Sequence, residues 1–237
     1  MRRFAERCFP IVKAASPRLA GAIWRQLHCS VRTRVQGEGN EMRYGSAVLR
    51  SVNFRIEGSR NVIEIGDGAH LQDVTFHIRG DDHRITIGRS CRFNRGGNIW
   101  FEDHHGRLTI GDESTFEDVH LVVSEPHSSI VIGRDCMFAY DIDVRTGDSH
   151  ALLDQVTGAR VNAAQNIGFG DHVWVAAHCR ILKGVSVAQD SVIATGSVVT
   201  KAFVEPGVVL AGNPARVVRE GITWSREKYG PSSKARS

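Results

Sequence analysis

Residues 65–70 read Ile-Gly-Asp-Gly-Ala-His, and blocks of the same design recur at residues 87–92, 110–115 and 132–137. Each block opens with Ile and Gly and carries a small residue at its fifth position. After residue 168 such blocks follow one another every six residues, almost without interruption. A six-residue repeat is typical of a solenoid of short strands, so we predict an all-β fold built as one long stack.

The spacing of the blocks predicts the shape of one coil. Three six-residue sides close a triangular coil, in which the aliphatic opener of each side points inward and the polar positions turn the corner. Stacked coils share backbone hydrogen bonds about 4.8 Å apart, and each coil buries the apolar layer of the one below. We expect this parallel β-helix over residues 39–212, between an N-terminal segment, 1–38, and a C-terminal tail, 213–237. The tail is expected to be short and poorly ordered from Glu220 onward.

The earlier coils carry excursions. Their openers Ile65, Ile87, Ile110 and Ile132 lie 22, 23 and 22 residues apart, which exceeds an eighteen-residue coil by four or five residues each time. The excursions fall in the same part of every coil, so we expect their loops to stack into a ridge.

Three histidines share one position on this ridge, because His83, His105 and His150 each lie eighteen residues after the opener of their coil. A histidine there can pack a loop, contact an acceptor molecule or transfer protons, since imidazole titrates near neutral pH. Only His150 is followed by a long insertion, residues 151–165, and then by the uninterrupted repeats. We therefore single out His150 for chemistry and expect His83 and His105 to line the ridge, where they would touch a substrate.

Composition agrees with a narrow stack. The chain has 237 residues, of which 41% are hydrophobic and only 7% aromatic, and this suits a thin aliphatic core. Three of the five cysteines, Cys91, Cys136 and Cys179, fall on the small fifth position of their blocks. We interpret them as small buried residues in a reducing compartment, neither disulfides nor ligands, and expect a cytoplasmic protein.

Positive charge is concentrated at the beginning of the chain. Residues 1–35 hold eight Arg or Lys against the single acid Glu6, although the whole chain has a net charge of only +4. One interpretation is a short helix that packs on the open end of the stack, and the other is a basic helix lying on an anionic membrane. Pro10 and Pro17 shorten any helix there and favour the first. No apolar run is long enough to span a bilayer.

The last third of the chain carries more specific motifs. Residues 171–175 read Asp-His-Val-Trp-Val, residues 193–201 read Ile-Ala-Thr-Gly-Ser-Val-Val-Thr-Lys, and residues 211–217 read Ala-Gly-Asn-Pro-Ala-Arg-Val. In this order they resemble the hexapeptide-repeat acyltransferases, and most of all the bacterial O-acetyltransferases of sugars and surface polysaccharides. The resemblance is detailed over residues 143–220 and only periodic over 45–142. It implies a left-handed β-helix and a homotrimer, with acetyl-CoA bound in clefts between subunits.

The resemblance also implies roles for individual residues. In this family a loop histidine just before the coenzyme-binding coils acts as the general base, and His150 occupies that place. Trp174 matches a tryptophan that lines the site near the thioester, and its alternative role is to cap a corner of the coil. Either Asp143 or Asp148 would orient the imidazole, and nothing in the sequence selects between them.

Four further positions match the family's coenzyme-binding residues. Lys201 and Arg216 match basic residues that meet the phosphates of CoA, a task for which both side chains are suited. Arg216 also suits a solvated surface. Thr195 and Ala176 stand where relatives carry Ala and Gly, and both departures affect how closely the pantetheine arm approaches the backbone.

A metal site is not expected within one chain, despite eleven histidines. Some β-helices of this repeat type are zinc-dependent carbonic anhydrases that gather histidines from adjoining subunits. Here His172 and His178 are six residues apart, so they fall on adjacent sides of the prism and do not converge on one ion. A site between subunits stays open as an alternative.

Three functions remain at this point. The first is transfer of an acetyl group from acetyl-CoA to a hydroxyl of a saccharide, directly and without a covalent intermediate. The second is transfer to the amine of an amino sugar or nucleotide sugar, and the third is a β-helix that binds a partner without catalysis. We expect a saccharide partner, self-association as a homotrimer and no nucleic acid, with peripheral membrane contact through residues 1–35 as an open alternative.

Overall fold

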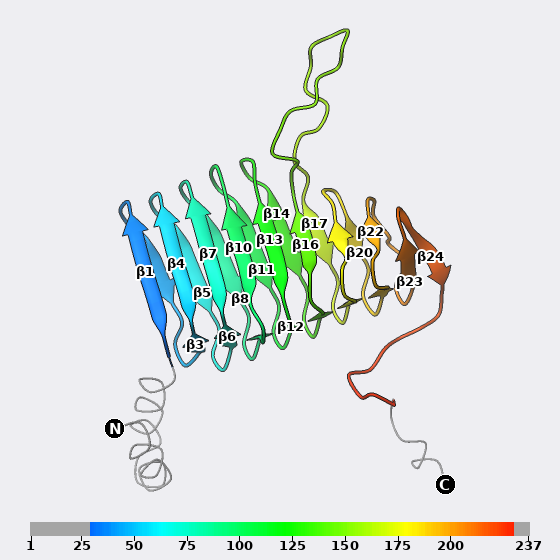
Figure 1. The fold of residues 1–237 in the computed structure, drawn as a ribbon, viewed down its shortest axis with the longest axis horizontal. Coiled ribbons are helices and arrows are strands. Elements are labelled where there is room, and N and C mark those ends of the chain that lie inside the picture. Colours follow the sequence, from blue (N-terminus) through cyan, green and yellow to red (C-terminus); the bar gives the residue numbers. More distant parts are fainter. Residues whose placement is uncertain (1–28, 230–237) are drawn as a thin grey trace, which may run out of the picture.

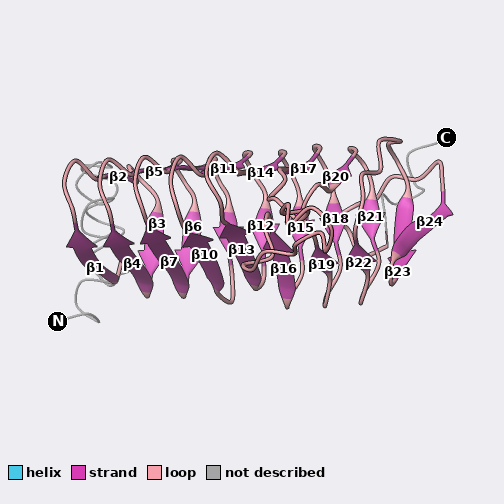
Figure 2. Cartoon of the chain, turned by 90° about the horizontal axis from the view of Figure 1, so that it is seen from above, coloured by secondary structure: helices cyan, strands magenta, loops and turns pink. Residues whose placement is uncertain are grey.

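The computed structural model describes residues 29–229, and every regular element in that range is a β-strand (Figure 1). The predicted helical segment lies mostly in residues 1–28, outside the described residues. The strands stack into three sheets, parallel except for the last strand, which form the three sides of a prism and which we call sheets A, B and C (Figures 1 and 2). This is the parallel β-helix that the six-residue repeat predicts.

Sheet A has eight strands: β1 (Val31–Gln36), β4 (Val52–Glu57), β7 (Val74–Arg79), β10 (Gly97–Phe101), β13 (Val119–Val123), β16 (Ile142–Arg145), β19 (Arg180–Ile181) and β22 (Val198–Val199). Sheet B has seven: β2 (Glu41–Arg43), β5 (Val62–Ile65), β8 (Arg84–Ile87), β11 (Arg107–Ile110), β14 (Ser129–Ile132), β17 (Ile167–Phe169) and β20 (Ser186–Val187). Sheet C has nine: β3 (Val48–Arg50), β6 (His70–Gln72), β9 (Arg92–Phe93), β12 (Thr115–Phe116), β15 (Met137–Phe138), β18 (Trp174–Val175), β21 (Val192–Ile193), β23 (Val209–Gly212) and β24 (Ala215–Arg219).

The strands reach slightly beyond the predicted limits of the β-helix. Strand β1 lies within the segment 1–38 and pairs in parallel with β4, so the first coil begins inside the basic N-terminal region. At the other end, β24 turns back and pairs antiparallel with β23. Within residues 29–229 there is no helix long and apolar enough to cross a membrane.

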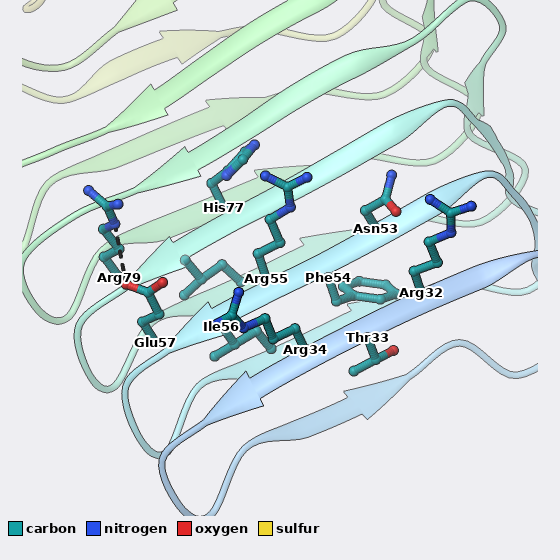
Figure 3. A pocket seen from close by; sticks show the side chains of 11 residues that line it. Arg32, Thr33, Arg34, Asn53, Phe54, Arg55, Ile56, Glu57, His77 and Arg79 are labelled. Carbon is teal, nitrogen blue, oxygen red and sulfur yellow. Dashed lines mark ion pairs between the residues drawn. The ribbon is translucent and has the colours of Figure 1, made fainter.

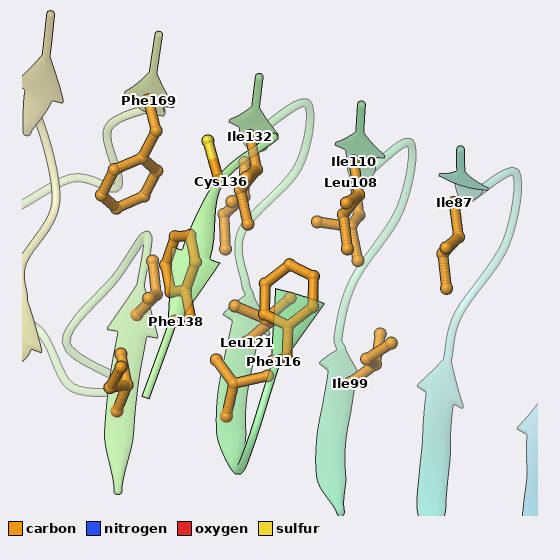
Figure 4. Close-up of a cluster of buried hydrophobic side chains, with 14 of the residues drawn as sticks. Ile87, Ile99, Leu108, Ile110, Phe116, Leu121, Ile132, Cys136, Phe138 and Phe169 are labelled. Carbon is orange, nitrogen blue, oxygen red and sulfur yellow. The ribbon is translucent and has the colours of Figure 1, made fainter. Parts of the chain in front are cut away.

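The predicted openers form one buried column. Ile65, Ile87, Ile110 and Ile132 pair in register across sheet B, and each is 4% exposed or less. The core is less purely aliphatic than composition suggests, because sheet C adds a column of phenylalanines (Figure 4). Successive rings of Phe93, Phe116 and Phe138 lie 4.5 and 5.0 Å apart. Identical side chains on successive coils therefore pack on one another, which transmits one coil's register to the next.

The small fifth position is confirmed as an inward corner. Ala69, Cys91, Ser114 and Cys136 are all 0% exposed, and the described cysteines are free thiols. The Cys136 Sγ contacts the carbonyl oxygen of Gly170 at 3.2 Å. Burial raises the pKa of the Cys91 and Cys136 thiols to about 11, as expected for unreactive core residues.

The excursions share one edge of the prism, where sheet A turns into sheet B. The chain there passes so close to the next coil that only glycine fits at Gly80, which has φ 104°. A Cβ at this position would lie 1.6 Å from the carbonyl oxygen of Asp103. The longest excursion leaves this edge between β16 and β17 and rises well clear of the stack (Figure 1). The predicted ridge is therefore present, with residues 146–166 as its largest loop.

The chain beyond Glu220 corrects the expectation of a loose tail. The described residues, up to 229, run back along the stack and pack on sheet C (Figure 1). The indole Nε1 of Trp224 donates to the carbonyl oxygen of His172 at 2.7 Å. Arg226 donates to the Asp135 carboxylate at 2.8 Å and to the Thr115 hydroxyl at 2.9 Å, so it crosses coils that precede it by about a hundred residues.

Candidate functional site

His150 lies in the long excursion, five residues after the end of β16. Its side chain is exposed, and the imidazole makes no hydrogen bond with any residue between 29 and 229. The preceding Ser149 has φ 65°, so the backbone turns sharply just before the histidine. A ring in this position is open to an incoming molecule.

The backbone around His150 is held by Asn162, a residue that the sequence did not single out. The Asn162 side chain is 5% exposed, and its Nδ2 donates to the carbonyl oxygen of His150 at 2.8 Å. Its Oδ1 accepts from the backbone N–H of Leu152 at 2.8 Å and from the Arg160 guanidinium at 3.1 Å. Asn162 therefore fixes the main chain at His150 and just after it, while the ring remains exposed.

Lys183 ties this clamp to the body of the β-helix. Its Nζ donates to the Asp148 carboxylate at 2.5 Å and to the carbonyl oxygen of Asn162 at 2.7 Å. Asn162 Nδ2 also donates to Asp148 at 2.9 Å. The hydrogen bond from Lys183 is the largest influence that holds the pKa of the Asp148 carboxyl below its ordinary value. Asp148 is thus an anionic anchor of the loop.

A second link joins the long loop to the neighbouring excursion of the ridge, residues 124–128. The Arg160 guanidinium donates to both carboxylate oxygens of Glu125, at 2.9 and 2.5 Å. Glu125 also accepts from the backbone N–H of Ala164 at 3.2 Å. These bonds hold the pKa of Glu125 below its ordinary value, chiefly through Arg160. The excursion at 124–128 therefore supports the returning arm of the long loop, residues 160–164.

Neither predicted partner orients the imidazole. Asp148 bonds to Lys183 and Asn162, and Asp143 bonds to Arg145 at 2.8 Å. Burial acts to raise the pKa of Asp143, but the contacts from His120 and Arg145 outweigh it and hold the pKa well below its usual range. Of the two candidates, Asp148 acts on His150 only through the backbone clamp.

The expectation that His83 touches a substrate is wrong. His83 is 0% exposed, and its Nδ1 accepts from the backbone N–H of Gly106 at 3.0 Å. Its Nε2 lies 3.0 Å from the carbonyl oxygen of Arg79. Burial lowers the pKa of His83, which favours the neutral ring that these two contacts require. His83 is therefore a fully satisfied core residue.

His105 lies on the surface of the ridge, as predicted. Its ring stacks on that of His127, with centroids 4.8 Å apart and planes 9° from parallel. Both side chains are exposed. The excursions at 102–106 and 124–128 therefore present a flat pair of imidazoles beside the long loop.

Trp174 lies on a different side of the prism from the His150 loop. It starts β18 in sheet C, and its half-buried ring lies 6.0 Å from that of Trp224. Trp224 in turn stacks on His172, with centroids 4.2 Å apart. The returning C-terminal segment thus supports the Trp174 region, a contact that the sequence analysis missed. Ala176, just beyond Trp174, is 8% exposed.

The other predicted coenzyme residues are dispersed along the last coils. Thr195 is exposed in the turn between β21 and β22, and Arg216 is exposed on β24 in sheet C. Lys201 follows β22 on the same edge as the His150 loop, and its Nζ lies 5.5 Å from the Phe203 ring. Within one chain these residues do not gather around His150.

The two histidines considered as metal ligands are paired with carboxylates instead. The Nδ1 of His172 lies 2.9 Å from Asp190, and that of His178 lies 2.7 Å from Asp141. Among residues 29–229, no group of three or more His, Cys, Asp or Glu side chains is placed to hold a metal ion.

A prism of hexapeptide coils with a histidine-bearing loop defines the class of protein. No family model matches the sequence. The crystal structure of NeuO, described as a polysialic acid-specific acetyltransferase, is similar, with a TM-score of 0.76 and 30% identity over 84% of this chain and 90% of that one. The structure of the polysialic acid O-acetyltransferase OatWY gives a TM-score of 0.70 and 26% identity over 85% of this chain and 94% of that one.

Curated relatives agree over shorter stretches. The polysialic acid O-acetyltransferase of Escherichia coli O1:K1 is 33% identical over 88 residues, which cover 37% of this chain and 28% of the relative. The galactoside O-acetyltransferase of Escherichia coli K12 is 48% identical over 54 residues, or 23% of this chain and 26% of the relative. The chain thus matches less than a third of the length of these curated relatives. The likeness to NeuO over most of both chains places this protein in the hexapeptide-repeat acetyltransferase family, whose left-handed β-helix it shares.

Proposed function

We propose that this protein transfers an acetyl group from acetyl-CoA to a hydroxyl of a saccharide. The observation that carries the proposal is the state of His150. Its backbone is clamped by the buried Asn162, while its ring is exposed and makes no hydrogen bond with residues 29–229. A positioned imidazole with no protein partner suits proton transfer to and from a substrate. The names of the relatives, which act on polysialic acid and galactosides, support a saccharide acceptor.

In this mechanism the His150 imidazole takes the proton of an acceptor hydroxyl as its oxygen attacks the thioester carbonyl carbon. The C–S bond then breaks, and the imidazolium returns the proton to the departing CoA thiolate, so the histidine ends neutral. No enzyme-bound acyl group forms. The chain's contribution is to hold the base in place through Asn162 and Lys183, because general-base catalysis requires the acceptor oxygen within hydrogen-bond distance.

The acetyl-CoA site is proposed to lie between subunits of a homotrimer. Trp174 and Arg216 lie on sheet C, whereas the His150 loop leaves the edge between sheets A and B. A centre that uses both sides therefore needs a second copy of the chain, which presents its sheet C to the first copy's loop. In that arrangement Trp174 and Ala176 would flank the thioester, while Thr195, Lys201 and Arg216 would meet the rest of the coenzyme, with the two basic residues on its phosphates.

The cellular location is a separate proposal, which the buried cysteines support. We propose a cytoplasmic enzyme, because three buried free cysteines are compatible with a reducing compartment. Membrane contact through residues 1–35 is a separate proposal. It is tested by flotation with anionic vesicles before and after removal of residues 1–28, which lie outside the described part of the chain.

The test is acetyl-CoA-dependent thiol release with a panel of neutral and acidic saccharides, followed by mass spectrometry of the acceptor. An O-acetyl group is removed by mild base, whereas an N-acetyl group is not. His150→Ala should reduce turnover by about a thousandfold with unchanged subunit number. The matched control His127→Ala, also an exposed ridge histidine, should retain kcat within about threefold, since its ring lies outside the clamp.

Two outcomes would contradict the proposal. Full turnover by His150→Ala would show that His150 is not the base. No thiol release with any acceptor, together with no binding of CoA, would instead favour a β-helix that binds a partner without catalysis.

A further inference from the structure

The outer face of sheet A carries a column of side chains that are mostly basic or aromatic. Backbone register aligns one outward residue from each successive strand, from β1 to β16: Arg34, Arg55, His77, Trp100, Val122 and Arg145. Their neighbours along each strand point inward and are buried, as shown by Phe54, Phe76 and Ile99. The column therefore faces outward along the length of the prism and ends five residues before His150.

The first coils of this face carry positive charge with little to neutralise it. Arg32, Arg34 and Arg55 make no hydrogen bond or ion pair with any residue between 29 and 229. The one acid on these strands, Glu57, lies 3.5 Å from Arg79. The long side chains border a shallow hollow of about 480 Å³ on the face of β1, β4 and β7 (Figure 3). Three guanidinium groups thus stand open at its edge.

His77, on the same face, lies within the influence of these positive charges. Partial burial, followed by the positive charges of Arg55 and Arg79, lowers the pKa of His77. Its ring lies 4.7 Å from that of Trp100, and the Arg79 guanidinium stands 5.6 Å from the Trp100 centroid. The face therefore combines anion-binding groups with a flat aromatic surface, on which the apolar face of a sugar ring can pack.

We infer that this face binds an acidic polysaccharide chain and guides it to the His150 loop. The arginines supply the complementary charge for carboxylates along the polymer, and the His77–Trp100 pair supplies a stacking surface. Five rung spacings separate β1 from β16, a span of roughly 24 Å, so only an acceptor of several sugar units reaches from the loop to the open arginines. The part of this inference that concerns delivery to His150 rests on the proposed function; binding to the face does not.

The test reverses two charges on this face. Arg34→Glu with Arg55→Glu should raise the Kd for long polysialic acid and for polygalacturonate by about tenfold or more, since attraction becomes repulsion at two adjacent rungs. The matched control is Arg84→Glu with Arg107→Glu, an exposed pair on adjacent rungs of sheet B. It should change Kd by less than about twofold. Binding of both polymers to the unaltered face should weaken as salt is raised, and dextran, which is uncharged, should not bind.

Binding is measured in the His150→Ala background, so failure of the proposed chemistry does not affect the readout. Equal Kd values for the two double variants would overturn the inference even if acetyl transfer is demonstrated. It would also be overturned if the unaltered protein bound anionic vesicles or nucleic acid but neither polymer, or if the sheet A variant alone changed the subunit number, which would make this face a subunit interface. The same sheet A variant with His150 intact should keep its turnover with a monosaccharide acceptor and lose it with long chains, and this result would support the inference.

Discussion

Replacing Asn162 with Ala should slow the enzyme without unfolding it. The side chain makes four hydrogen bonds, of which two hold main-chain atoms of His150 and Leu152 at 2.8 Å each. At about 1 kcal/mol apiece, those two contribute about 2 kcal/mol to the position of the imidazole. If the barrier to proton transfer rises by the same amount, kcat falls by about 30-fold. The KM for acetyl-CoA should stay within about twofold, because the clamp does not contact the proposed coenzyme residues.

The assay is steady-state kinetics with a saturating acceptor, together with proteolysis of the loop. Asn166→Ala is the matched control, because Asn166 lies at the end of the same excursion and, among residues 29–229, its side chain bonds only to the backbone N–H of Ser129, from which it accepts at 2.9 Å. It should keep kcat within about twofold. The account of the clamp would be refuted if Asn162→Ala retained normal kcat, or if Asn166→Ala lost as much. A rise in KM alone would also refute it, since positioning of the base acts on kcat.

Three further predictions follow from the described contacts. The hydrogen bond from Lys183 depresses the pKa of Asp148, so the anchor is present above the ordinary value of 3.8 and is lost as the pH falls through the depressed pKa. Cleavage of the loop by pepsin, divided by the cleavage of an unfolded substrate at the same pH, should increase in that window. An equal ratio at pH 5 and at about pH 2 would argue against the anchor. A thiol reagent at neutral pH should modify the half-buried Cys29 and leave Cys136 unmodified, because burial raises the pKa of Cys136 to about 11. Similar rates of modification for the two thiols would contradict the burial of Cys136. Phe116→Ala should lower the free energy of unfolding by about 3–5 kcal/mol, since the ring is 0% exposed and packs on rings of both adjacent coils. Denaturant unfolding measures this change, and a loss below about 1 kcal/mol would contradict the phenylalanine column.

The sequence was sufficient to predict the stack because each position of the repeat meets a requirement for burial or for close packing that recurs in every coil. An aliphatic opener buries its side chain in every coil, and the Gly that follows it passes against the backbone of the next coil, as Gly66 does. These requirements recur at fixed spacing, so Ile65, Ile87, Ile110 and Ile132 were all placed correctly. Composition understated the aromatic content of the core, because the few phenylalanines are concentrated at equivalent inward positions.

The error at His83 arises from the direction of counting. A count of eighteen residues forward from the opener equates His83 with His105, yet the coil that contains His105 is one residue longer. Counted back from the next strand, His83 corresponds to Asn61 and Gly106, which are also buried. The pairing of the following strand sets the register of the loop, so inward and outward positions exchange with a single added residue.

The clamp and the C-terminal contacts were beyond the reach of pattern analysis. Asn162 stands in an irregular loop, and its partners come from both ends of that loop and from Lys183 in the next coil. Trp224 and Arg226 contact coils that are distant in sequence, and no periodicity relates them. A lone tryptophan in a polar tail was the available signal, because a large aromatic side chain gains most from burial.

The central claim is that the His150 imidazole meets the donor thioester at a seam between two copies of the chain. It is tested most directly by a crystal structure of the protein with CoA and an acidic oligosaccharide. We predict the imidazole within about 4 Å of the CoA sulfur and about 3 Å from an acceptor hydroxyl, with Trp174 contributed by the neighbouring subunit. A CoA sulfur more than about 10 Å from every His150 ring, or a site completed by a single chain, would contradict the account.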